Sequence, residues 1–156
     1  MIHDASIHHS ATEADIKAKI GARVATVRDV EARCKAAFLP LLREHGITRV
    51  EIGYDGSGDE GFVGDVLAYS GNELADIPAI QCDHYSLDFK GEVHTRTMQL
   101  EDALSAFGEN AVCDHHCGWE NGEGAHGTIA IDVASATITL THNERFIDYE
   151  TTEAEI

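Results

Sequence analysis

Two short segments near the C-terminus constrain the fold more than any other part of the chain. Residues 128–133 (TIAIDV) and 137–141 (TITLT) alternate apolar residues with small or polar ones, and most are β-branched. A period of two residues is typical of β-strands that are buried on one face. The short link 134–136 predicts that the two strands form an antiparallel hairpin.

This hairpin predicts where polar residues that are distant in the sequence meet. Trp119, Glu120 and Asn121 precede the first strand, whereas residues 142–145 (HNER) end the second. Antiparallel pairing places both groups at one end of the sheet. The cluster contains two candidate general bases, His142 and Glu120, but no Ser or Cys is placed beside His142 by spacing, so nucleophilic catalysis is not predicted.

A long helix is predicted from residue 11 to the stop signal at His45–Gly46, with Pro40 expected to kink or end it. Thr12 and Asp15 have the spacing of a capping box. Apolar residues recur at steps of three and four, which places them on one helix face: Ile16, Ile20, Val24, Val27, Val30, Cys34, Phe38 and Leu41. Cys34 is interpreted as an inert core thiol.

The middle of the chain predicts three further strands and a second helix. Residues 48–54 and 62–69 form a hairpin around the loop 55–61, a third strand covers 80–89 and extends towards 93, and a helix covers 97–116. The chain therefore predicts an α+β fold. A long N-terminal helix and a second helix pack on one face of an antiparallel sheet of about five strands, in the order α-β-β-β-α-β-β. Residues 1–10 are expected to be a loose leader, 11–150 a single domain and 151–156 an acidic tail.

The charge is strongly asymmetric along the chain. The net charge is −17, from 11 Lys and Arg against 28 Asp and Glu. Residues 1–49 carry a net +2, and residues 50–156 carry a net −19. Such a field repels nucleic acid and acidic membranes and attracts cationic surfaces, although it could serve solubility alone. With no signal-like leader and no apolar run of about 20 residues, the protein is predicted to be cytoplasmic, with free thiols.

One segment carries the residue types of a metal site. If the second helix continues through residues 113–117 (CDHHC), then Cys113, His116 and Cys117 share one face, and His126 supplies a fourth ligand for tetrahedral zinc. This reading predicts a zinc-binding protein or a small metal-dependent hydrolase. The alternative is that the segment is only the C-terminus of the helix, where the positive charge of protonated histidines interacts favourably with the helix dipole. The loop at 55–60 (DGSGDE) lacks the glycine and the final acid of a calcium loop, so it is interpreted as a hairpin loop with exposed acids.

Three segments resemble a known family: 48–61 (TRVEIGYDGSGDEG), 118–133 (GWENGEGAHGTIAIDV) and 137–146 (TITLTHNERF). They are similar to a family of small acidic bacterial proteins encoded on plasmids and other mobile elements, which has no assigned function. The resemblance covers residues 46–146. It implies no catalytic residues, and it implies a context in which small acidic proteins often act as anti-defence factors.

Charge and resemblance together predict a non-enzymatic binding protein. It would occupy a basic, nucleic-acid-binding surface of a bacterial defence complex, of the CRISPR or restriction type, without binding nucleic acid or membrane itself. The expected partner is therefore a basic protein or ribonucleoprotein, and no cofactor is needed unless zinc is bound. The chain is compatible with a monomer or a homodimer. The expected contacts are Asp55, Asp59, Glu60, Trp119, Glu120, Glu123 and Glu144.

Overall fold

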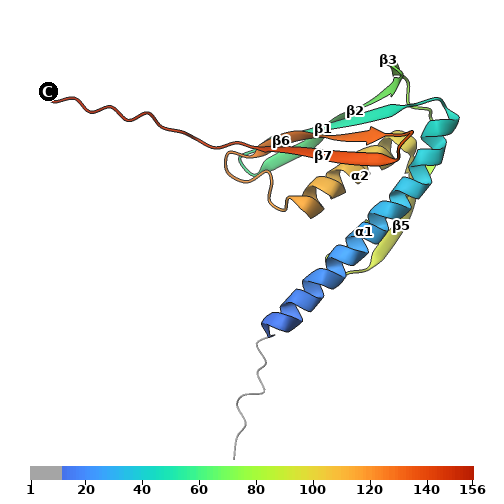
Figure 1. The fold of residues 1–156 in the computed structure, drawn as a ribbon, viewed down its shortest axis with the longest axis horizontal. Coiled ribbons are helices and arrows are strands. Elements are labelled where there is room, and N and C mark those ends of the chain that lie inside the picture. Colours follow the sequence, from blue (N-terminus) through green and yellow to red (C-terminus); the bar gives the residue numbers. More distant parts are fainter. Residues whose placement is uncertain (1–11) are drawn as a thin grey trace, which may run out of the picture.

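The computed structural model describes residues 12–156 and confirms the α+β fold (Figure 1). The predicted leader, residues 1–10, lies outside the described residues. The elements follow the chain as α1 (Glu13–Glu44), β1 (Arg49–Ser57), β2 (Glu60–Ser70), β3 (Glu73–Ala75), β4 (Gln81–Leu87), β5 (Val93–Gln99), α2 (Leu100–His115), β6 (Ala125–Asp132) and β7 (Thr137–Glu144). Neither helix in this part of the chain has an apolar stretch of the length that a membrane crossing requires.

The larger sheet has five antiparallel strands in the order β3-β2-β1-β6-β7. The predicted C-terminal hairpin is confirmed, with Thr128 opposite Thr141 and Ile131 opposite Ile138. Its inward residues Ile129 and Ile131 are fully buried, which is what the two-residue period predicted.

The smaller sheet corrects the prediction for residues 80–99. Instead of one strand followed by a helix from residue 97, β4 and β5 form a separate two-stranded sheet, and α2 begins at Leu100. The turn between them is built on Asp88, whose Oδ1 accepts hydrogen bonds from the amides of Lys90 and Glu92, each at 2.9 Å. The β5 strand was missed because it has no buried face: only Met98 is even half-buried, so no alternation marks it.

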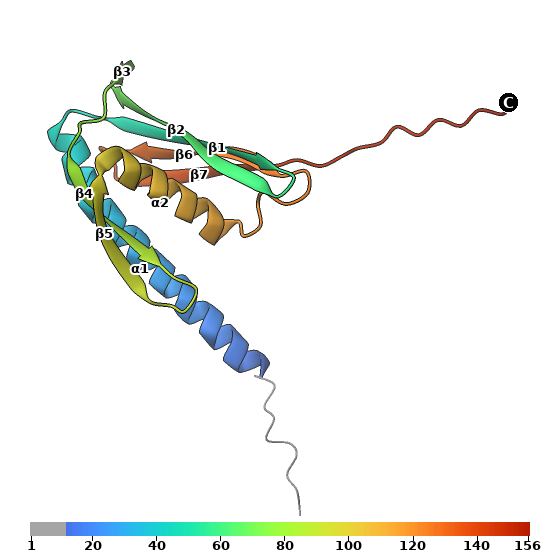
Figure 2. The same ribbon diagram turned by 180° about the vertical axis from the view of Figure 1, so that it is seen from behind.

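Both helices contribute to one core. α2 lies along one face of the five-stranded sheet, and α1 runs beside β4 and α2 (Figures 1 and 2). Phe38 of α1 and Phe107 of α2 meet edge to face with ring centroids 5.2 Å apart. Among the side chains that are completely or almost completely buried, the largest are Phe38, Leu42, Ile52, Leu100, Leu104, Ile129 and Ile131.

The apolar stripe of α1 is buried over only part of its length. The helix continues through Pro40 to Glu44, and the capping box of Thr12 and Asp15 is present. Burial begins at Val30. Before that residue, Ile16, Ile20 and Val24 are 47%, 59% and 44% exposed. The N-terminal half of α1 therefore extends away from the core (Figure 2).

Two substitutions on the stripe of α1 test this division. Leu42→Ala should lower the free energy of unfolding by about 2–5 kcal/mol, because it leaves a cavity in the core. Ile20→Ala should change it by less than about 0.5 kcal/mol, because the side chain is exposed. Urea denaturation measures both values. A comparable loss in both variants would contradict the division and would indicate that a second copy covers the N-terminal half of α1 in solution.

Candidate functional site

Three segments meet at the end of the sheet from which the C-terminal chain leaves (Figure 1). The amide of Gly58 in the β1–β2 turn donates to the carbonyl of Gly122 at 2.9 Å, and that of Asp59 donates to Glu120 at 3.1 Å. The amide of Arg145, after β7, donates to Gly124 at 2.9 Å. We call this the acidic end, and its carboxylates belong to Asp55, Asp59, Glu60, Glu120, Glu123 and Glu144.

Trp119 anchors the loop 116–124 on the sheet. It is buried and meets Tyr54 edge to face, with ring centroids 5.2 Å apart. The indole lies directly on two glycines: a Cβ built on Gly56 or Gly61 would come within 2.7 Å or 2.5 Å of its ring carbons. Trp119 was predicted as a partner contact, but its burial makes it mainly the support that holds the acidic loop in place.

A polar pocket of about 490 Å³ opens beside Trp119. Its wall combines the two predicted polar groups: Trp119 and Asn121 before β6, and His142, Glu144 and Arg145 at the end of β7. The prediction that these residues meet is therefore confirmed. The pocket also contains residues from the end of α2 that the hairpin argument did not include: His115, His116 and Cys117.

His142 is held in one orientation by a chain of hydrogen bonds. The Tyr54 hydroxyl donates to the carbonyl of Thr141 at 3.2 Å and lies 2.6 Å from Nδ1 of His142. When the single phenolic proton is on the Thr141 carbonyl, Nδ1 of His142 carries the proton of the Tyr54 contact; when Tyr54 donates to Nδ1 instead, the imidazole proton is on Nε2. In the first of these tautomers Nε2 has its lone pair towards the pocket, 3.8 Å from Oε1 of Glu144.

His116 stacks on His142 with ring centroids 3.6 Å apart and planes within 7° of parallel. Burial, and then the neighbouring His116, lower the pKa of His142. The lowered pKa favours the neutral ring, which has one nitrogen lone pair able to bind a ligand.

Arg145 fastens the acidic end together. Its guanidinium donates to the carbonyls of Gly56 and Ala125 at 3.2 and 3.3 Å and to Oδ1 of Asp55 at 2.8 Å. One predicted contact residue, Asp55, therefore has an internal partner. Asp59, Glu60, Glu123 and Glu144 are exposed, and Glu120 is half-buried.

The predicted zinc ligands are dispersed by the fold. Since α2 ends at His115, Cys113, His116 and Cys117 do not share a helix face. Cys113 borders a separate hollow with Trp119, whereas His116 and Cys117 line the histidine pocket. His126 lies on β6 opposite Asn143. Desolvation, followed by the carboxylates of Glu109 and Glu120, raises the pKa of the Cys113 thiol.

The structure instead brings together a different set of potential ligands. Among residues 12–156, ligand atoms lie within 4.8 Å of one another in two groups: His116 with His142 and Glu144, and Asp88 with Glu92 and His94. Sequence reasoning placed His142 and Glu144 in one cluster but had no signal to join them to His116, because the turn after α2 decides where that ring lies.

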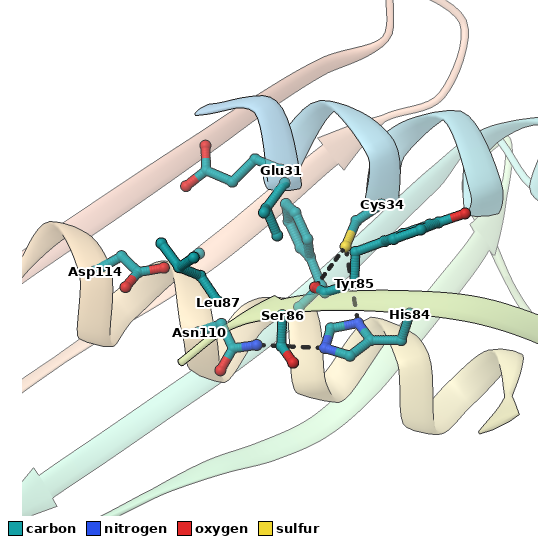
Figure 3. Close-up of a pocket in the computed structure, with 11 residues that line it drawn as sticks. Glu31, Cys34, His84, Tyr85, Ser86, Leu87, Asn110 and Asp114 are labelled. Atoms are coloured by element: carbon teal, nitrogen blue, oxygen red, sulfur yellow. Dashed lines mark hydrogen bonds between the residues drawn. The ribbon is translucent and has the colours of Figure 1, made fainter. Parts of the chain in front are cut away.

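A second polar cluster, Cys34, His84 and Asn110, is enclosed between α1, β4 and α2 (Figure 3). The Asn110 amide donates to Nε2 of His84 at 3.3 Å, Nδ1 lies 3.8 Å from the Cys34 sulfur, and that thiol donates to the Tyr85 carbonyl at 3.2 Å. These are the residue types of a cysteine hydrolase, but burial raises the pKa of the Cys34 thiol. The cavity of about 40 Å³ has room for little more than a water molecule. The cluster is therefore structural, as Cys34 was predicted to be.

The buried His84 makes stability depend on pH. Burial lowers its pKa in the folded state, so the unfolded chain takes up the proton first. The free energy of unfolding should fall as the pH falls below about 6.5, the ordinary histidine pKa, and continue to fall until the lower folded pKa is reached. In urea denaturation between about pH 7.5 and pH 5, His84→Gln should show a shallower decline than the unaltered chain. Equal slopes in the two proteins would contradict this role of His84.

The packing of Trp119 on glycine can be tested with two glycines of adjacent strands. Gly61→Ala should cost about 1–3 kcal/mol of unfolding free energy and should red-shift the fluorescence of Trp119, the only tryptophan, because the added carbon displaces the indole. Gly53→Ala is the matched control, since a Cβ there meets nothing within 4 Å. If the spectrum of Gly61→Ala is unchanged, the indole does not rest on this glycine.

Comparison with known proteins places the chain in a family without transferring a function to it. No curated protein and no solved structure matches the chain. A family of unknown function, DUF6878, matches residues 30–156, from the first buried residue of α1 to the C-terminus. The expected membership of a family without an assigned function is thus confirmed. Because the match covers most of the chain, the protein belongs to DUF6878, a family of unknown function.

Proposed function

We propose that the protein is a non-enzymatic acidic binding protein whose acidic end occupies a basic surface of a partner. The observation that carries this proposal is the gathering of six carboxylates from three segments: the β1–β2 strands and turn, the loop 116–124 and the end of β7. Backbone hydrogen bonds hold these segments together, so the carboxylates are presented as one surface before a partner arrives.

The charge balance at the acidic end favours a cationic partner. Arg145 is the basic residue at the acidic end, and its guanidinium is bonded to Asp55 and to two carbonyls. It therefore does not neutralise the other carboxylates. A surface that binds nucleic acid is built to accept closely spaced negative charges. Carboxylates of the acidic end would take the place of phosphates there and block the nucleic acid by occupancy.

The class of partner follows from the resemblance to proteins of mobile elements. A nucleic-acid-binding complex of bacterial defence, of the CRISPR or restriction type, offers a basic channel of the required charge. The same occupancy would apply to either type, because both must bind phosphate backbones.

The proposal is tested by capturing partners from bacterial lysate with the tagged chain at about 0.1 M and about 1 M salt. The Debye length falls from about 10 Å to about 3 Å over this range, so a charge-driven complex should be released. We expect a nucleic-acid-binding protein that is captured at low salt, released at high salt and displaced by added DNA or RNA. A partner retained equally at both salt concentrations would contradict the mechanism.

A matched pair of variants locates the surface. The triple variant Asp59→Asn, Glu60→Gln, Glu123→Gln should weaken binding of the captured partner at least about tenfold, mostly by slowing association. The control removes three exposed carboxylates elsewhere, through Glu44→Gln, Glu73→Gln and Asp76→Asn. Because both variants change the net charge equally, equal losses would show that only the overall charge matters and would reject the acidic end as the binding surface.

A further inference from the structure

We propose that His116, His142 and Glu144 form a binding site for a divalent transition-metal ion in the pocket beside Trp119. This set of ligands differs from the predicted zinc ligands Cys113, His116, Cys117 and His126, with which it has only His116 in common. It also goes beyond binding of a basic partner, because the ion would be taken up by the chain itself.

The donor atoms have the chemistry and spacing of a metal site. Two imidazoles and one carboxylate are ligands of zinc and of other first-row metals. Ligands at about 2.0–2.2 Å from one ion lie about 2.8–3.6 Å apart for octahedral to tetrahedral angles. Nε2 of His142 and Oε1 of Glu144 are 3.8 Å apart, and the nearest ligand atoms of all three residues lie within 4.8 Å. Movements of less than about 1 Å bring the first two to coordination distance of one ion.

His142 already has the supporting contact that ligating histidines require. A ligating histidine generally donates its second N–H to an acceptor, which fixes the tautomer and aims the free nitrogen at the ion. Here Nδ1 is held at 2.6 Å by the Tyr54 hydroxyl, which is itself fixed on the carbonyl of Thr141. The side chain of His142 is only 8% exposed, so its orientation is set by packing.

His116 is the ligand that has to move. The lone pairs of stacked rings lie in parallel planes, whereas one ion needs lone pairs that converge on it. His116 is the C-cap residue of α2 and is half-buried, and binding of the ion would require its ring to rotate on its side-chain bonds, away from the stacked arrangement. Glu144 is the adaptable ligand, because its side chain is 79% exposed.

The surroundings favour a cation and leave it accessible. Arg145 also lines the pocket, but its guanidinium is paired with Asp55, and the carboxylates of the acidic end raise the local concentration of cations. Three protein ligands would leave at least one position open to the pocket of about 490 Å³, which is the arrangement of accessible rather than purely structural metal sites.

The second group of potential ligands, Asp88, Glu92 and His94, is not proposed as a metal site, because the oxygens of Asp88 already have partners. Asp88 uses one oxygen on two backbone amides and the other on His94 at 2.7 Å. Its oxygens therefore build the β4–β5 turn. This group supplies a control position.

The test is titration of the full chain with Zn²⁺ by calorimetry and with Co²⁺ by visible absorption. His3, His8 and His9 are replaced by Gln in every protein, because histidines at the N-terminus could bind the same ions. We expect one ion per chain with a Kd of about 1 μM or tighter. Glu144→Gln and His116→Gln should each weaken binding at least about tenfold, and Tyr54→Phe should weaken it about 10- to 100-fold through His142.

Matched variants decide where the ion sits. His94→Gln should leave the affinity unchanged, as should Cys113→Ser. Absence of saturable binding would overturn the proposal, and so would affinities unaffected by Glu144→Gln and His116→Gln. Loss of binding in Cys113→Ser alone would move the site to the cysteine segment and would also overturn it. Circular dichroism should show that the Glu144 and His116 variants remain folded.

Discussion

The contact between Trp119 and the two glycines Gly56 and Gly61 is the interaction on which the functional end of the molecule depends. Only positions without a Cβ leave room for the indole against the β1–β2 hairpin. Through this contact the loop 116–124 lies on the sheet, close enough for its carbonyls to accept the amides of the β1–β2 turn. The placement of His116 beside His142 follows from the same contact, because the loop begins at that histidine.

The acidic end gathers like charges, which disfavours folding, and the backbone hydrogen bonds between its segments offset that cost. Positive charge that binds at the acidic end relieves this repulsion, whether it belongs to a metal ion in the pocket or to the basic surface of a partner protein. The two proposals therefore use the same electrostatic property at different scales. The two proposals can be tested separately, because Asp59, Glu60 and Glu123, which are removed to test partner binding, are not among the proposed metal ligands.

The long first helix has two parts with different environments. From Val30 onwards it is part of the core, and the match to the family begins at the same residue. Residues 13–29 lie outside both, although their apolar stripe continues with Ile16, Ile20 and Val24. Periodicity identifies a face that a helix is able to bury, but a partner element has to be present to bury it.

Local patterns in the sequence predicted the β6–β7 hairpin, which has one buried face, and the capping box at the exposed start of α1. The hairpin in turn predicted the meeting of Trp119 with the end of β7. Patterns failed for β5, which has no buried face and whose last residues were assigned to the second helix, whereas the predicted end of that helix at residue 116 agrees with the observed end at His115 to within one residue. Only the tertiary structure decided that His84 lies beside Cys34 and that His116 lies on His142. Such contacts join residues whose separation is set by the packing of whole elements, and no spacing along the chain encodes that distance.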